Sequence, residues 1–171
     1  RRDDMVSNRP KVAVIMGSDS DLPVVNKAIR VLKEFEIDFE ARVISAHRTP
    51  DKAASFAKDS EEKGFDIIIA AAGKAAHLPG VLAAYTVLPV IGIPVKSSTL
   101  DGMDSLLSIV QMPSGIPVAT VGIDGAENAG LLAVEMLSLK YSSLKEALKM
   151  HRKKMQQEVN KKDEKIRGED L

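Results

Sequence analysis

Hydrophobic residues recur along the chain in two patterns: short apolar runs, and longer segments in which they are spaced three or four positions apart. The short runs have the length and the valine and isoleucine content of β-strands, and the nearly continuous ones are typical of strands buried on both faces. The predicted strands cover residues 11–16, 38–45, 65–71, 89–95 and 118–121. The predicted helices cover residues 24–35, 50–63, 81–85, 105–110 and 126–139, and a last one begins near Ser142.

Strands that alternate with helices are typical of βαβ units, in which right-handed crossovers build a parallel sheet. We therefore predict an α/β fold, a flavodoxin-like three-layer α/β/α sandwich with a five-stranded parallel sheet and an extra C-terminal helix. The polar residues 1–10 are predicted to form a flexible N-terminal arm. Residues 11–160 are predicted to form a single domain that includes the last helix, and residues 161–171 a charged tail.

Composition narrows the classes of function. Lys and Arg together number 24, as do Asp and Glu, so no overall field favours nucleic acid or a membrane surface. The absence of cysteine excludes disulfides, thiolate metal sites and cysteine nucleophiles, and only three histidines argue against a histidine-rich metal centre. No apolar run reaches the length of a membrane span. We therefore expect a protein that binds neither nucleic acid nor membrane, and the absence of cysteine fits a reducing compartment, while an all-oxygen metal site remains open.

The first predicted strand ends in the segment 17–21, Gly-Ser-Asp-Ser-Asp. Gly17 allows a close backbone approach, and the free N–H groups at a helix start attract anions. Ser18 and Ser20 add hydroxyl donors, whereas Asp21 suits the hydroxyl groups of a sugar or simply caps the helix. The segment fits neither the dinucleotide-binding pattern GxGxxG nor a P-loop. A capped turn and a ligand-binding loop are equally consistent with it.

The second predicted strand ends in Ser-Ala-His-Arg-Thr-Pro, residues 45–50. Pro50 is suited to the first turn of the next helix, and Thr49 to its N-cap. His47 and Arg48 therefore stand where a strand passes into a helix, at the edge where open α/β sheets bind ligands. An imidazole exchanges protons near neutral pH, and a guanidinium binds phosphate or carboxylate. The alternatives are a surface histidine and an arginine in a structural salt bridge.

The loop after the third predicted strand, residues 73–80, is rich in small residues. Ala75 and Ala76 leave room for a ligand and let backbone amides face it. We predict that His77 is a buried histidine that supports the loop rather than one that transfers a proton. The polar residues 96–104 are predicted to form either a lid over a ligand or an ordinary surface connection.

Four motifs taken together are similar to those of a known family. They are Met-Gly-Ser-Asp-Ser-Asp at 16–21, Ser-Ala-His-Arg-Thr-Pro at 45–50, Ala-Ala-His-Leu-Pro-Gly at 75–80 and Asp-Ser-Leu-Leu-Ser-Ile-Val-Gln-Met-Pro at 104–113. In this order and at this spacing they resemble N5-carboxyaminoimidazole ribonucleotide mutase, the PurE family in its class I form, over about residues 11–140. Each motif alone is a weak signal, and the four together are highly specific.

The resemblance implies an isomerase of de novo purine biosynthesis in the cytoplasm. Such an enzyme moves a carboxyl group from the exocyclic nitrogen of N5-carboxyaminoimidazole ribonucleotide to carbon 4 of the ring, which gives 4-carboxy-5-aminoimidazole ribonucleotide. The expected route is decarboxylation followed by recapture of the carbon dioxide. The resemblance implies no metal and no organic cofactor, a small-molecule nucleotide as substrate, and a homo-octamer with sites at subunit contacts.

The same resemblance implies roles for individual residues. His47 would be the general acid–base, and Ser18, Asp21 and Arg48 would contact the ribose phosphate. The other residues expected in the substrate site are Gly17, Ser20, Ser45, Ala46, Ala72, Gly73, Lys74, Ala75, His77 and Leu78. Lys74 departs from the family pattern because a second glycine usually stands there, and a positive φ at that position would strain a lysine.

Two other interpretations stay open from the sequence. One is a class II-type phosphoribosylaminoimidazole carboxylase that uses free carbon dioxide; the arginine at position 48 favours class I. The other is a non-enzymatic flavodoxin-like module that binds flavin or another nucleotide. A flavin site is less consistent with a chain that has two tyrosines, four phenylalanines and no tryptophan. A third interpretation, a receiver-type signalling domain, is less favoured. That fold needs acidic residues clustered at strand ends with a phosphorylatable aspartate, and Asp19 and Asp21 resemble such a cluster only weakly.

Overall fold

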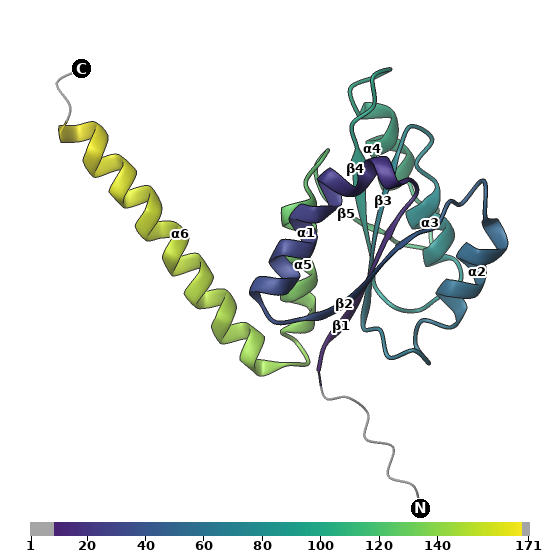
Figure 1. Ribbon diagram of the computed structural model, residues 1–171, viewed down its shortest axis with the longest axis horizontal. Coiled ribbons are helices and arrows are strands. Elements are labelled where there is room, and N and C mark those ends of the chain that lie inside the picture. The colour runs from purple at the N-terminus through teal and green to yellow at the C-terminus, as the bar shows by residue number, and fades with distance from the viewer. Residues whose placement is uncertain (1–8, 169–171) are drawn as a thin grey trace, which may run out of the picture. The chain divides into compact units, whose positions relative to one another are not determined.

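A computed structural model of the chain describes residues 9–168, and its larger part is a sheet with helices on both faces (Figure 1). Five parallel strands lie in the order β2-β1-β3-β4-β5, which confirms the predicted flavodoxin-like sheet. The strands are β1 (Lys11–Met16), β2 (Asp38–Val43), β3 (Ile67–Gly73), β4 (Val90–Val95) and β5 (Ala119–Thr120). Most of the predicted N-terminal arm, residues 1–8, lies outside the described residues.

Helical segments connect the strands and follow the last one. They are the 3-10 helix η1 (Asp19–Asp21) and the α-helices α1 (Leu22–Glu34), α2 (Pro50–Lys58), α3 (Leu78–Ala83), α4 (Met103–Val110), α5 (Ala126–Leu137) and α6 (Ser142–Gly168). The helix predicted over 81–85 begins three residues earlier, because Pro79 fits the first turn of α3. The predicted 118–121 strand is confined to the two residues of β5.

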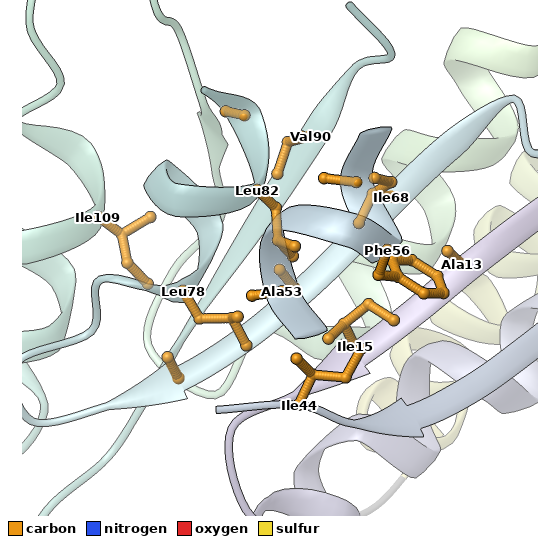
Figure 2. Packing of buried hydrophobic residues seen from close by; sticks show 14 of the residues in the cluster. Ala13, Ile15, Ile44, Ala53, Phe56, Ile68, Leu78, Leu82, Val90 and Ile109 are labelled. Atoms are coloured by element: carbon orange, nitrogen blue, oxygen red, sulfur yellow. The ribbon is translucent and has the colours of Figure 1, made fainter. Parts of the chain in front are cut away.

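One face of the sheet packs against α2, α3 and α4 through a cluster of buried apolar side chains (Figure 2). Ile15 of β1 and Ile68 of β3 belong to this cluster, together with Phe56 of α2, Leu82 of α3 and Ile109 of α4. All five side chains are at most 5% exposed. Burial of this apolar surface stabilises the layer that carries the loops at both edges of the sheet.

The other face of the sheet is equally buried. Val14 and Ile69 alternate along β1 and β3 with the residues of the first face and are fully buried. Helix α1 and the start of α5 lie on the side of the sheet opposite α2 and α3 (Figure 1). Gly130 of α5 faces α1 closely, since a Cβ atom there would lie 2.8 Å from the Cβ of Val31. Helices on both faces explain why the strands read as nearly continuous apolar runs.

The turn after α2 differs from the predicted helix over 50–63. The helix ends at Lys58, and hydrogen-bonded turns continue to Gly64. Gly64 has a φ of +76°, in the left-handed region that favours glycine. The glycine therefore reverses the chain, as the sequence predicts, but after a run of turns instead of directly after the helix.

The chain divides into two units, of which the first extends to Ala133 and the second begins at Val134. In the second unit α6 continues to Gly168, so the part of the predicted charged tail that the structure describes is helical. Its lysines and glutamates are strong helix formers, and Lys149 pairs with Glu146 at 2.7 Å. The single domain over 11–160 stays a prediction. No helix among residues 9–168 is long and apolar enough to cross a membrane.

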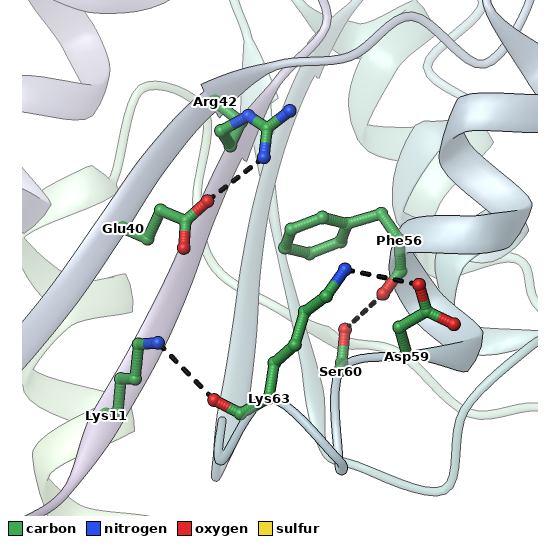
Figure 3. A network of polar contacts seen from close by, with 7 residues as sticks. All are labelled: Lys11, Glu40, Arg42, Phe56, Asp59, Ser60 and Lys63. Carbon is green, nitrogen blue, oxygen red and sulfur yellow. Dashed lines mark hydrogen bonds and ion pairs between the residues drawn. The ribbon is translucent and has the colours of Figure 1, made fainter.

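At the amino edge of the sheet, where the strands begin, polar groups are paired with one another (Figure 3). The Lys11 ammonium donates to the Lys63 carbonyl at 3.4 Å, and the Lys63 ammonium pairs with Asp59 at 3.2 Å. The buried Ser60 hydroxyl donates to the Phe56 carbonyl at 2.6 Å. These contacts fasten the turn after α2 to the start of β1.

Candidate functional site

At the carboxyl edge of the sheet, where the strands end, four loops surround a pocket of about 610 Å³. The loops follow β1, β2, β3 and β4, and the chain order reverses between β1 and β3, the position at which open α/β sheets bind ligands. The residues that the sequence predicts for the site all line this pocket: Gly17, Ser18, Ser20, Asp21, Ser45, Ala46, His47, Arg48, Ala72, Gly73, Lys74, Ala75, His77 and Leu78.

The loop after β1 is a capped turn that also forms a wall of the pocket. The Ser18 hydroxyl accepts from the Ser20 N–H, and the Ser18 N–H donates to Asp21 Oδ2, each at 3.3 Å. This capping box holds Asp21 with only 8% of its surface exposed. Burial raises the pKa of the Asp21 carboxyl; the Ser18 N–H opposes the rise, and the nearby charge of Asp19 adds to it.

A reciprocal pair of hydrogen bonds closes the turn after β2. The Thr49 hydroxyl accepts from the Ser45 N–H and donates to the Ser45 carbonyl, both at 3.0 Å. Thr49 does occupy the N-cap position of α2, as predicted, but its side chain makes no hydrogen bond to the helix. The bonds to Ser45 take the hydroxyl instead, so Thr49 fixes the turn that presents His47 and Arg48.

Arg48 ties the loop after β2 to the loop after β1. Its N–H donates to the Ser45 hydroxyl, and its Nη2 donates to the Gly17 carbonyl, both at 3.2 Å. The side chain is exposed and pairs with no carboxylate among residues 9–168, so the structural salt bridge considered from the sequence is not found there. A guanidinium has five N–H groups, which leaves further donors for an anion in the pocket.

The two histidines of the pocket contact each other. His47 Nε2 lies 2.7 Å from His77 Nδ1, and the ring planes are nearly perpendicular at 81°. One imidazole donates and the other accepts, so a proton lies between the two nitrogens. The prediction that His77 is buried is wrong: its neighbours Ala76 and Leu78 turn inward, at 1% and 2% exposure, and leave His77 facing the pocket.

Lys74 adopts the left-handed backbone conformation, with a φ of +55°. This is the circumstance in which the sequence predicts strain, since such a conformation costs a residue with a Cβ atom about 1–2 kcal/mol. The preceding Gly73 ends β3 against β4, where a Cβ atom would lie 3.4 Å from the Val95 carbonyl. The chain therefore turns sharply into the pocket at this point.

Lys96, Ser97 and Ser98 also line the pocket, although they were not among the predicted site residues. The Lys96 N–H donates to Asp124 Oδ1 at 2.9 Å, and its ammonium pairs with Asp101 at 3.2 Å. The Ser97 hydroxyl donates to Asp104 at 3.1 Å. Their position directly after β4, which neighbours β3, is the signal that would have identified them, because only the start of the predicted 96–104 loop reaches the pocket.

The assembled pocket combines exposed cationic side chains, two linked imidazoles, serine hydroxyls and one buried carboxyl group. Such a set suits an anionic ligand that carries hydroxyl groups and exchanges a proton with the protein. Ala72, Gly73 and Ala75, which line the pocket, have small side chains or none and so leave space for a ligand. No group of three or more metal-ligating side chains lies within residues 9–168.

Comparisons with known proteins identify close relatives. The sequence profile described as AIR carboxylase matches residues 11–158. The chain is 65% identical over 146 residues to the N5-carboxyaminoimidazole ribonucleotide mutase of Pyrococcus abyssi, a match covering 85% of this chain and 84% of that protein. The Pyrococcus horikoshii mutase is 57% identical over 95% of this chain and 92% of its own length. The crystal structure of Treponema denticola PurE superposes with a TM-score of 0.82 at 30% identity and covers 92% of this chain and 99% of that one.

Proposed function

The chain belongs to the AIR carboxylase family, and on this premise we propose that it is an N5-carboxyaminoimidazole ribonucleotide mutase of purine biosynthesis. The substrate is a nucleotide that carries a carboxyl group on its exocyclic nitrogen, and the product carries that group on carbon 4. The reaction is an isomerisation, so it consumes no second substrate. The chain's high identity to two mutases over most of its length supports this proposal.

We propose that the reaction proceeds by decarboxylation and recapture. Protonation of the exocyclic nitrogen breaks its bond to the carboxyl carbon, and the bonding electrons stay on nitrogen as carbon dioxide leaves. Carbon 4, made electron-rich by the amino group, then attacks the carbon of the retained carbon dioxide. The hydrogen on carbon 4 leaves as a proton to a base. One group that gives and then takes a proton therefore serves both steps.

The linked imidazoles of His47 and His77 are the observation that carries this proposal. His47 is the general acid–base, and His77 orients it through the 2.7 Å contact between His47 Nε2 and His77 Nδ1. Because Nε2 of His47 is engaged by His77, the proton reaches the substrate either from the other His47 nitrogen or after the nucleotide displaces His77. Both imidazoles line the pocket, so neither route requires a group from outside it.

The anionic end of the nucleotide fits the wall formed by the loops after β1 and β2. Arg48 and the hydroxyls of Ser18 and Ser20 supply donors for the phosphate, and the N–H groups at the start of a helical segment add to them. Asp21 suits the ribose better than the phosphate, because its carboxyl group accepts hydrogen bonds from hydroxyl groups and repels another anion. The contact between Arg48 and the Gly17 carbonyl keeps these two loops together for this task.

The middle of the pocket suits retention of carbon dioxide. Ala72, Gly73 and Ala75 leave room for a small linear molecule, and the apolar Leu78 is one of the lining residues. Carbon dioxide that diffused away would have to be replaced from bicarbonate, so a site that excludes water favours recapture. We propose that bound nucleotide completes this enclosure.

The test feeds the purified protein each nucleotide separately in buffer freed of bicarbonate. In this buffer N5-carboxyaminoimidazole ribonucleotide should be converted to the 4-carboxy isomer. In a second reaction, which contains unlabelled bicarbonate, a carboxyl group labelled with carbon-13 on the substrate should be retained in the product. Aminoimidazole ribonucleotide should not be carboxylated. Carboxylation of the latter that rises with bicarbonate, without isomerisation of the former, would assign the chain to the carboxylases instead.

We also propose the homo-octamer that the resemblance implies. Large apolar side chains on and next to α4 support it, since Leu100, Met103, Leu107 and Val110 are each 48–59% exposed. Sedimentation equilibrium measures the particle mass directly. The proposal requires about eight times the 18.5 kDa of one chain, and a monomer at micromolar concentration would contradict it.

A further inference from the structure

The left-handed residues of the chain that are not glycine differ in what their side chains do. Among residues 9–168 they are Glu36, Lys74, Asp101 and Asp124, with φ between 53° and 55°. Asp101 and Asp124 both hold Lys96, through an ion pair at 3.2 Å and a backbone hydrogen bond at 2.9 Å. Lys74 lies in the pocket and makes no hydrogen bond or ion pair with any residue in the described part of the chain. Its strained backbone therefore holds an ammonium group without an internal partner.

The other cationic side chains of the pocket are engaged. The Arg48 guanidinium donates to the Gly17 carbonyl at 3.2 Å, and the Lys96 ammonium pairs with Asp101 at 3.2 Å. Asp21, the acidic residue that lines the pocket, is used by the capping box of the loop after β1. Among these cations, Lys74 is consequently the one whose charged group is not already shared with an acceptor of the protein.

The register of the sheet places two cations at neighbouring strand ends. Gly73 pairs with Val95 at the ends of β3 and β4, and Lys74 and Lys96 follow these residues directly. Both lysines line the pocket, and Asp101 pairs with Lys96 only, so the charge of Lys74 has no counter-charge there. An anion that reaches the loop after β3 removes this imbalance.

We propose that the ammonium group of Lys74 binds the migrating carboxylate of the nucleotide and thereby positions it. The inference rests on the proposed function, and it assigns a side chain to the carboxylate of the substrate. Arg48 and Lys74 belong to the loops after β2 and β3, which flank β1 on either side. The phosphate and the carboxylate of one nucleotide then bind to opposite sides of the pocket, with the histidine pair between the two loops.

The chemistry predicts which kinetic constant changes. The carboxyl group carries a negative charge in the substrate and in the product, whereas released carbon dioxide is neutral. Lys74 therefore strengthens the binding of both carboxylated nucleotides and contributes little to the step between them. Loss of its charge should raise KM in both directions and leave kcat nearly unchanged.

Titration calorimetry with two nucleotides tests the proposal. We compare Lys74→Gln and Lys74→Arg with wild type, using 4-carboxy-5-aminoimidazole ribonucleotide and the uncarboxylated aminoimidazole ribonucleotide. Lys74→Gln should bind the carboxylated nucleotide about tenfold more weakly, the effect of one charge-assisted contact, and the uncarboxylated one as wild type does. Lys74→Arg should restore most of the difference, and Lys27→Gln, which removes an exposed charge on α1, should change neither affinity.

The outcomes distinguish failure of the role of Lys74 from failure of the proposed function. Equal affinities of Lys74→Gln and wild type for the carboxylated nucleotide would overturn the role of Lys74 while wild-type turnover still upholds the mutase. Equal losses for both nucleotides would also overturn it, because the lysine would then bind a group that they share. A wild-type protein that binds neither nucleotide would overturn the proposed function together with this inference.

Discussion

The two edges of the sheet are both rich in polar side chains, but they use them differently. At the amino edge Lys11, Lys63 and Asp59 form hydrogen bonds and ion pairs with one another or with nearby carbonyls (Figure 3). At the carboxyl edge His47 and His77 contact each other, and Lys74 has no partner among the described residues. Both edges are shaped by parallel strands and tight turns, so the fold alone does not cause the difference. The contacts at the amino edge therefore hold the fold, whereas side chains at the carboxyl edge keep polar groups that a ligand can bind.

This comparison predicts that substitutions at the two edges separate stability from activity. The largest expected effect is that of His47→Asn. Loss of the proton-transfer group should lower kcat by about 10²–10⁴-fold, while the exposed side chain contributes little to stability. Steady-state kinetics together with thermal unfolding measure both quantities. Turnover within a factor of two of wild type would remove His47 from the mechanism.

Arg48→Gln is expected to have the next largest effect. The guanidinium provides charged donors to the phosphate, and their loss should raise KM about 10–100-fold with a smaller change in kcat. The contact between Arg48 Nη2 and the Gly17 carbonyl also disappears, so the loops after β1 and β2 should become more mobile. Measurement of KM at two salt concentrations checks the assignment, because wild-type binding should weaken with salt and the variant should respond less.

Ser60→Ala is the counterpart at the amino edge. The Ser60 side chain is fully buried, and its hydroxyl donates to the Phe56 carbonyl at 2.6 Å. Its removal should cost about 1 kcal/mol of unfolding free energy and leave kcat and KM unchanged. Urea denaturation followed by circular dichroism gives the first value, and the mutase assay gives the others. A loss of activity without a loss of stability would break the comparison between the edges.

A pair of variants at Lys74 isolates the strain in the loop after β3. Lys74→Ala and Lys74→Gly both remove the ammonium group, but only glycine adopts a φ of +55° without strain. The free energy of unfolding of the glycine variant should therefore exceed that of the alanine variant by about 1 kcal/mol. The larger entropy of the unfolded glycine chain reduces this difference in part. Equal midpoints in chemical denaturation would show that the loop relaxes around the alanine.

The smallest expected effect concerns Asp21 and pH. Burial raises the pKa of this carboxyl in the folded protein above its ordinary value of 3.8, so the folded state binds its proton more tightly than the unfolded state. Its contribution to stability is complete below pH 3.8 and is lost as pH rises through the raised pKa. Asp21→Asn should flatten this part of the stability profile and be slightly more stable than wild type above the window. Denaturation midpoints across pH 3–7 supply the comparison.

Much of the fold follows from the sequence, because continuous apolar runs specify strands that helices cover on both faces. Parallel strands also bring the loops after β1, β2 and β3 to one edge of the sheet, which gathers the residues of the pocket. A lysine in place of glycine at position 74 predicts strain if φ is positive, and the φ of Lys74 is +55°. These features depend on local pattern and on the parallel topology, both of which the sequence carries.

Other features depend on contacts that a sequence does not display. The orientation of His77 is set by the inward turn of Ala76 and Leu78, and periodicity within a loop does not predict it. Thr49 bonds Ser45 across the turn instead of capping α2, because two partners compete for one hydroxyl. Lys96 lies in the pocket because it follows β4, which pairs with β3. That pairing is known only once the order of the strands in the sheet is known.

A crystal structure with bound 4-carboxy-5-aminoimidazole ribonucleotide tests the central claim most directly. We expect a nucleotide at the carboxyl edge, with its phosphate bonded to Arg48, its carboxylate bonded to Lys74 and carbon 4 next to His47. The distance from carbon 4 to the closer His47 nitrogen should be about 3–3.5 Å, the range for reacting groups. A nucleotide bound at the amino edge, or one that turns its carboxylate away from the histidines, would contradict the account.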